Sequence, residues 1–184
     1  MLWHRLKHPC IWFTETDRPR LLANAQAPFW KPLFEQWRAA LARVPRLALQ
    51  GPVIDFHTGN TAAAMQAALC HAVDQDEHSG RLIASFLEEV VAYYRDHSPT
   101  WSRHMTAAYK GEWVGYQWQG LSNNFIIDPM LWFSMAHLYD VIYGKGFLRE
   151  ADAADFEQMM GRFHRLCCLH EELVKLDNNR AAWL

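Results

Sequence analysis

The sequence predicts an all-α protein built from antiparallel helical hairpins, and three observations carry this prediction. Apolar residues recur at intervals of three and four along several segments, which is the spacing of one face of an α-helix. No convincing run alternates apolar and polar residues, as a half-buried strand does. The link between the predicted helices 60–73 and 81–95 is short, so these two helices should lie antiparallel to each other.

The first helix signal is Thr14, which suits an N-cap because acidic residues follow it in the first turn. The next predicted helix spans 28–44, and Pro45 ends it. One face of this helix is apolar, and it consists of Phe29, Leu33, Trp37, Ala40, Leu41 and Val44.

Two hairpins should follow. Helix 60–73 is rich in Ala, and small side chains let a neighbouring helix approach closely, while Gly80 should separate it from helix 81–95. In the second hairpin, helix 128–143 starts at Asp128 and Pro129 and stops at the glycines that follow it. A long amphipathic helix then spans 150–176.

Composition excludes several classes of protein. The chain has 184 residues, which suits one helical domain over 1–184. Its formal net charge of -2 argues against nucleic-acid or anionic-membrane binding by bulk electrostatics. No targeting segment or membrane span is visible, which predicts a cytoplasmic protein, or a periplasmic or secreted one if the true start lies upstream.

Neither cysteines nor histidines show the spacing of a metal site. The four cysteines form no CxxC pair, which argues against a zinc ribbon and a disulfide scaffold. The ten histidines have no HExxH spacing, and each is expected to be a surface or partly buried residue rather than a ligand. We therefore expect no metal and no cofactor.

The segment 98–124 is the first candidate site. It is a long connection without periodicity, and such connections in compact domains are usually functional or disordered. Aromatic faces suit the C–H patches of a sugar, and amides suit its hydroxyls, which makes Trp113, Tyr116, Trp118, Asn123 and Asn124 candidate substrate-binding residues. The alternative is a loop whose Trp side chains plug the ends of the helices.

The second candidate site follows the last helix. Asn178, Asn179 and Arg180 carry amide and guanidinium groups, which can neutralise a carboxylate. The alternative is an ordinary helix junction, in which Asn178 caps the helix and Asp177 is solvated.

Three stretches together resemble heparinase II/III-like and alginate-lyase-like polysaccharide lyases. The stretch 8–14, HPCIWFT, with the Arg-Leu-Leu of 20–22, is similar to the opening of those chains. The stretch 136–143, AHLYDVIY, is similar to their Tyr-Asp-containing helix. The stretch 178–183, NNRAAW, is similar to their Asn-containing catalytic segment.

The resemblance implies part of an incomplete (α/α) toroid with a cleft for an acidic polysaccharide or oligosaccharide. Such enzymes cleave uronic-acid polysaccharides by β-elimination, in which an Asn offsets the uronate charge while a base removes the C5 proton. It therefore implies catalytic roles for Asn178, Asn179 and Arg180. However, Arg180 stands where the family has a His, and an Arg can bind a carboxylate but cannot act as a base.

The family also continues well past the point where this chain stops, at Leu184. We therefore expect an N-terminal fragment of a larger toroid, whose apolar faces expose a patch that favours self-association. The alternative function is a non-catalytic helical module that binds carbohydrate or protein.

Overall fold

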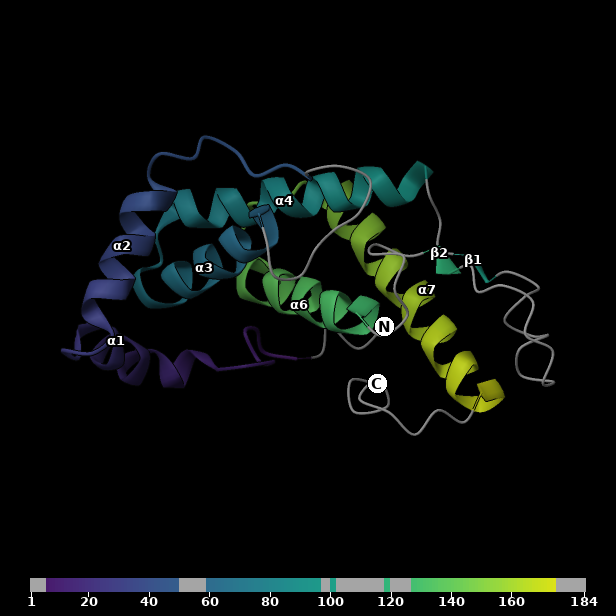
Figure 1. Cartoon of the computed structure of the whole chain (residues 1–184), viewed down its shortest axis with the longest axis horizontal. Helices are drawn as coiled ribbons and strands as arrows, with labels where there is room; N and C mark the ends of the chain where they lie inside the picture. Colours follow the sequence, from purple (N-terminus) through teal and green to yellow (C-terminus); the bar gives the residue numbers. More distant parts are fainter. Residues whose placement is uncertain (1–5, 50–58, 97–99, 102–117, 120–126, 175–184) are drawn as a thin grey trace.

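The described part of the chain is predominantly helical, which confirms the predicted class. A computed structural model describes residues 6–49, 59–96, 100–101, 118–119 and 127–174 (Figure 1). The elements in chain order are the 3-10 helix η2 Glu15–Asp17, α1 Arg18–Gln26, α2 Lys31–Leu41, α3 Gly59–Asp74, α4 Glu77–Asp96, β1 Thr100–Trp101, β2 Trp118–Gln119, α6 Ile127–Ile142 and α7 Glu150–Val174.

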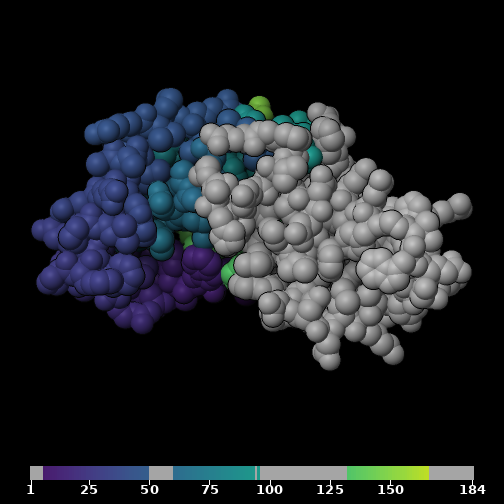
Figure 2. All heavy atoms as spheres, in the orientation of Figure 1, coloured from purple at the N-terminus to yellow at the C-terminus, as the bar shows by residue number. Residues whose placement is uncertain are grey.

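The first helices are shorter than the sequence pattern predicts. Thr14 does begin a helical segment, because its backbone N–H donates to the Asp17 carboxylate over 3.0 Å at the start of η2. The predicted helix 28–44 corresponds to α2, which begins at Lys31 with Pro32 in its first turn. In Figures 1 and 2, α1 and α2 form one end of the molecule, coloured purple to blue.

Helices α3 and α4 form the predicted antiparallel hairpin, and they lie side by side in Figure 1. Their link is only two residues long, and Gln75 adopts a left-handed conformation there with φ of 55°. The Asp76 carboxylate then caps α4, because it accepts the Ser79 backbone N–H over 2.9 Å and the Ser79 hydroxyl over 2.6 Å.

The prediction that Gly80 separates the two helices is wrong. Gly80 lies inside the first turn of α4, since the Asp76 cap starts that helix four residues earlier than expected. Glycine fits there for a packing reason: a Cβ at this position would lie 2.5 Å from the ring of Phe147, which would have to shift. The residue therefore marks a close approach between α4 and the segment that follows α6, and not a break in the chain.

The second hairpin joins α6 to α7, as predicted. Gly144 and Gly146 both have positive φ, of 70° and 75°, so the two glycines do end the first helix of this pair. Helix α6 contacts α3, α4 and α7, which places it at the centre of the helical assembly. Consistent with that position, Met135 and Leu138 have no exposed side-chain surface.

The hydrophobic core lies between α3, α4, α6 and α7. The Ala-rich face of α3 packs as the sequence predicts, since Ala64, Ala67 and Ala68 are completely buried. From α6 and α7, the rings of Trp132 and Phe163 stack with centroids 4.3 Å apart. Several large apolar side chains stay exposed outside this core, and they are Leu6, Trp12, Leu22, Phe29 and Trp30.

Two smaller features complete the fold. Strands β1 and β2 form a single antiparallel pair in which Trp101 lies opposite Trp118. Within the part of the chain that the structure describes, no helix is both long and apolar enough to cross a membrane.

Candidate functional site

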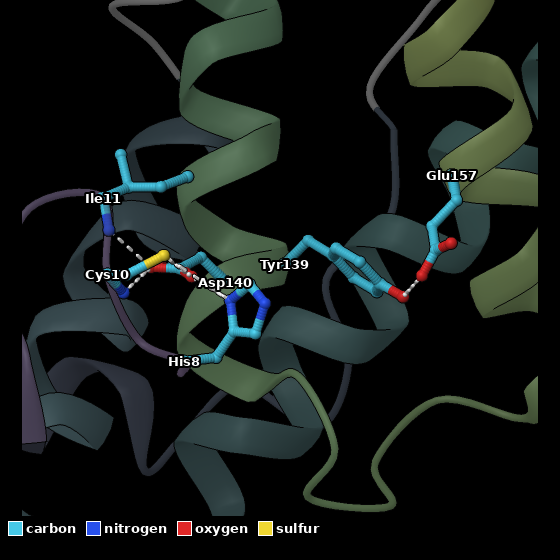
Figure 3. A network of polar contacts seen from close by, with 6 residues as sticks. All are labelled: His8, Cys10, Ile11, Tyr139, Asp140 and Glu157. Atoms are coloured by element: carbon cyan, nitrogen blue, oxygen red, sulfur yellow. Dashed lines mark hydrogen bonds and ion pairs between the residues drawn. The ribbon is translucent and has the colours of Figure 1, made fainter. Parts of the chain in front are cut away.

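A cluster of polar groups joins the N-terminal segment to α6 (Figure 3). His8 Nδ1 lies 2.5 Å from Asp140 Oδ1. The other carboxylate oxygen accepts two backbone N–H groups, from Cys10 over 2.8 Å and from Ile11 over 2.9 Å. The Cys10 thiol faces the same carboxylate, with Sγ 3.5 Å from Oδ1. A single side chain of α6 therefore holds His8, Cys10 and Ile11, which lie about 130 residues earlier in the chain.

The position of Asp140 explains why it needs so many donors. Its side chain is completely buried, and a charge taken out of water must be paired or hydrogen-bonded. It also stands in the last turn of α6, where the helix dipole disfavours an anion. The two backbone N–H groups and the imidazole offset both costs. This carboxylate is therefore stable only while residues 8–11 stay docked on α6.

The Cys10 thiol does not have the arrangement of a catalytic nucleophile. Burial, followed by the nearby Asp140 carboxylate, raises the pKa of Cys10, so the thiol keeps its proton at neutral pH. The sulfur lies 3.8 Å from His8 Nδ1, the same nitrogen that contacts Asp140. A Cys–His–Asp relay needs the thiol and the carboxylate on opposite nitrogens of the ring. The cluster therefore does not form a nucleophilic triad.

The side chains of His8, Cys10 and Asp140 are close enough together to bind one cation. One donor atom each from His8, Cys10 and Asp140 lies within 4.8 Å of the other two. The set combines a thiol, an imidazole and a carboxylate, and all three are ligands of transition metals. Among the residues that the structure describes, no other combination of His, Cys, Asp and Glu meets this criterion.

Aromatic rings connect the cluster to α7. The His8 ring packs against Tyr143 with centroids 4.2 Å apart, and Tyr143 meets Tyr139 edge to face at 5.4 Å. The Tyr139 hydroxyl then donates to Glu157 of α7 over 2.8 Å (Figure 3). Burial, and then this bond to a carboxylate, raise the pKa of Tyr139, so its hydroxyl stays a donor.

A cavity of about 440 Å³ lies beside these tyrosines. Its polar lining includes Tyr139 and Tyr143 together with the carboxylates of Glu150 and Glu157. Two carboxylates repel an anionic ligand, so this cavity suits a neutral or cationic group better than a uronate.

One turn before Asp140, α6 carries a histidine in a different environment. His137 is completely buried, and among the residues that the structure describes neither of its ring nitrogens has a hydrogen-bond partner. Its ring stacks on Trp12 with centroids 3.8 Å apart and meets the edge of Phe13. Burial lowers the pKa of His137 to about 4, although the nearby Asp140 acts in the opposite direction. The imidazole is therefore neutral at physiological pH.

A second cavity, of about 430 Å³, lies where α2 meets the α3–α4 link. The groups around it already serve structural roles: Arg38 pairs with Asp74, and Asp76 caps α4. Burial raises the pKa of Cys70 in its wall to about 11, so that thiol is unreactive at neutral pH. This cavity follows from the helix junction and shows no convergent chemistry.

The predicted sugar-binding and catalytic residues fall mostly outside the described part of the chain. Trp118 is the exception, because its backbone lies in β2. The others, which the structure does not describe, are Trp113, Tyr116, Asn123, Asn124, Asn178, Asn179 and Arg180. The sugar-binding and catalytic roles of these residues therefore stay predictions.

Sequence reasoning missed the His8–Cys10–Asp140 cluster. It treated each histidine by its local spacing, and His-x-Cys alone is too short a pattern to stand out. A signal was nevertheless present, since His8 and Asp140 belong to two of the stretches that carry the lyase resemblance. Joining them required knowledge of how the N-terminal segment crosses α6.

Comparison with known proteins gives no match to this chain, whether among family models, curated proteins or solved structures.

Proposed function

We propose that this chain is the helical part of a polysaccharide lyase of the heparinase II/III-like or alginate-lyase-like kind and that it binds a uronic-acid polysaccharide. One observation carries the proposal: two of the stretches behind the resemblance meet in space. His8 of the first contacts Asp140 of the second over 2.5 Å. A contact between two stretches more than 120 residues apart is expected if both belong to one inherited architecture.

The fold is compatible with this proposal. A toroid of this type consists of helical hairpins placed side by side, and α3–α4 and α6–α7 are two such hairpins in contact through α4 and α6. That the hairpins form part of a ring, and how many hairpins complete it, is what we propose.

In this proposal the reaction is removal of a proton from the carbon next to the uronate carboxylate, followed by loss of the glycosidic oxygen at C4. Asn178 and Asn179 donate N–H groups to the carboxylate, and Arg180 adds a positive charge that favours the enolate-like transition state. Arg180 cannot remove the proton, since its pKa is far above neutrality. The base is therefore a different group.

Substrate binding in this proposal depends on aromatic stacking in the segment 98–124. Trp113 and Trp118 provide flat faces for the sugar rings, and Asn123 and Asn124 provide hydrogen-bonding amides. The acidic cavity next to Tyr139 takes no part, because Glu150 and Glu157 disfavour a uronate there.

The test is a binding measurement by calorimetry with the full chain. Oligomers of alginate and of heparan type are titrated in turn, with an uncharged oligosaccharide of equal length as the ligand control. We expect a uronate oligomer to bind, and the variant Trp113→Ala/Trp118→Ala to bind it at least about tenfold more weakly, a loss of about 1.4 kcal/mol. The matched control Trp30→Ala removes a half-exposed Trp from the start of α2 and leaves affinity unchanged.

Two results would contradict the proposal: equal affinity for the uncharged oligosaccharide, or full affinity in the double Trp variant. Incubating the chain with a polymer that it binds then distinguishes a lyase from a non-catalytic carbohydrate-binding module. An unsaturated uronate product, detected by its ultraviolet absorbance, supports the lyase. Specific binding without product supports the alternative of a non-catalytic carbohydrate-binding module.

A further inference from the structure

The His8–Cys10–Asp140 cluster has nearly the dimensions of a zinc site. A tetrahedral zinc ion with bonds of about 2.3 Å to sulfur and about 2.0–2.1 Å to nitrogen and oxygen sets its ligand atoms roughly 3.3–3.6 Å apart. Cys10 Sγ lies 3.5 Å from Asp140 Oδ1 and 3.8 Å from His8 Nδ1, close to those separations. The remaining pair, Nδ1 and Oδ1, lies 2.5 Å apart because the two atoms share a hydrogen bond.

Only that last distance has to change for an ion to enter. The separation of Nδ1 and Oδ1 must increase by about 0.8 Å, which a small rotation of the two side chains achieves. Asp140 Oδ2 can keep its bonds to the backbone N–H groups of Cys10 and Ile11 during this change. Such outer hydrogen bonds fix the orientation of a ligating carboxylate and belong to the design of metal sites.

The chemistry of the three donors selects the metal. A thiolate excludes Mg²⁺ and Ca²⁺, which prefer oxygen ligands, and favours Zn²⁺ or Co²⁺ together with imidazole and carboxylate. When the ion binds, Cys10 releases its proton to solvent, and His8 coordinates through Nδ1 while its remaining ring proton sits on Nε2. No oxidant or reductant is required.

We propose that His8, Cys10 and Asp140 form a zinc-binding site that fastens the N-terminal segment to α6. Three protein ligands leave a fourth coordination position, which a water molecule fills. His8 and Asp140 are almost completely buried, with 4% and 0% of their side chains exposed, so the ion is shielded on the side of α6. This proposal does not depend on any activity toward polysaccharides.

The experiment uses the full chain freed of metal by a chelator and then titrated with Co²⁺, followed by competition with Zn²⁺. A cobalt ion bound by a thiolate gives a ligand-to-metal charge-transfer band in the near ultraviolet, and tetrahedral geometry gives visible bands. We expect both signals at one ion per chain, displacement by one equivalent of Zn²⁺, and a higher melting temperature with the metal.

Three variants decide the assignment. Cys10→Ser removes the sulfur while conserving size, and it should abolish the charge-transfer band and weaken zinc binding at least about tenfold. His8→Gln should weaken binding similarly while the thiolate band remains at high Co²⁺ concentration. The matched control Cys70→Ser changes a thiol that is 1% exposed and absent from the cluster, and it should bind as the wild type does.

The chain also contains Cys167 and Cys168, so every variant is repeated in a background where both are Ser. Loss of the band in that background alone would overturn the proposal, since the metal would then bind at those cysteines. Full affinity in Cys10→Ser, or a wild-type chain that binds no Zn²⁺ at micromolar concentration, would overturn it as well. Far-ultraviolet circular dichroism of each variant confirms that it is folded.

Discussion

Two histidines with buried side chains lie about one turn apart along α6, and one has a polar environment whereas the other has an aromatic one. His8 comes from the N-terminal segment and contacts the Asp140 carboxylate over 2.5 Å. His137 belongs to α6 itself and is completely buried, and in the described part of the chain neither of its nitrogens has a polar partner. The first ring lies in a polar cluster, whereas the second lies between the aromatic rings of Trp12 and Phe13.

The comparison shows that burial alone does not decide what a histidine contributes. Next to Asp140, the imidazole offsets a carboxylate that would otherwise be costly to bury. Beside Trp12, the imidazole acts as a flat ring, and its nitrogens cost free energy because they have lost their water. A histidine therefore stabilises a buried carboxylate at one turn of α6. At the turn before, the surroundings of the histidine disfavour a positive charge on its ring.

Replacing Asp140 by Ala is expected to have the largest effect. The change leaves the Cys10 and Ile11 backbone N–H groups and the His8 ring without their acceptor in a partly buried site. We expect the free energy of unfolding to fall by about 4 kcal/mol, measured by urea denaturation with a chelator present. Asp155→Ala is the matched control, because it removes an exposed partner of Arg95 and should cost less than about 1 kcal/mol. Equal losses in both variants would contradict this account of the cluster.

The second prediction concerns pH and His137. Its pKa is about 4 in the folded chain and 6.5 in the unfolded chain, so the unfolded state takes up the proton first as pH falls. The stability due to the neutral ring is complete above pH 6.5 and is lost between pH 6.5 and about 4, by about 3 kcal/mol in total.

The variant His137→Leu cannot titrate and should lack this part of the pH dependence, which urea denaturation of both proteins from pH 4 to pH 8 measures. His164→Gln, at an exposed position of α7, serves as the control and should keep the wild-type profile. Parallel curves for wild type and His137→Leu would show that the ring is not held neutral in the folded chain.

A smaller effect is expected from Trp12→Ala, which removes one of the rings that cover His137. Water can then reach the imidazole, so its pKa should rise toward the ordinary value, and stability at pH 7 should fall by about 1–2 kcal/mol. An NMR titration of the His137 ring protons measures the pKa directly. Trp30→Ala is the matched control, because Trp30 is equally exposed, at 49%, yet does not stack on a histidine. An unchanged His137 pKa in Trp12→Ala would mean that the other neighbours exclude water on their own.

The smallest effect should come from Tyr139→Phe. The change removes the hydroxyl that donates to Glu157 over 2.8 Å, and Glu157 is only partly buried, so water can replace the lost donor. We expect a loss of about 1 kcal/mol in the free energy of unfolding. The reference variant is Arg95→Ala, which breaks an exposed contact to α7 and should lose less. A loss as large as that of Asp140→Ala would show that the link to α7 is part of the same buried polar network.

The helices themselves could be predicted well from the sequence, because their apolar spacing is strong. The two hairpins, their order and the stop at Gly144 all follow from local signals. The start of α4 could not be predicted in this way. Gly80 is a weak helix former, but the Asp76 cap and the close packing of Phe147 decide its conformation, and the second of these is a tertiary contact.

The candidate site was less accessible to sequence reasoning. The contact between His8 and Asp140 spans 132 residues, and no local pattern marks one as the partner of the other. The absence of a partner for His137 is equally invisible in the sequence, because it depends on which rings close over α6. The resemblance did mark both stretches, but it gave no reason for them to touch. The roles proposed for Trp113 and Asn179 stay predictions.

The long separation between Cys10 and Asp140 also has a consequence for how the chain is made. A ribosome adds roughly 5–20 residues per second, so the acceptor of the Cys10 N–H is synthesised about ten seconds after its donor. The α3–α4 hairpin, with its two-residue link, can close during that interval. Residues 8–11 therefore cannot dock on Asp140 until α6 has been synthesised.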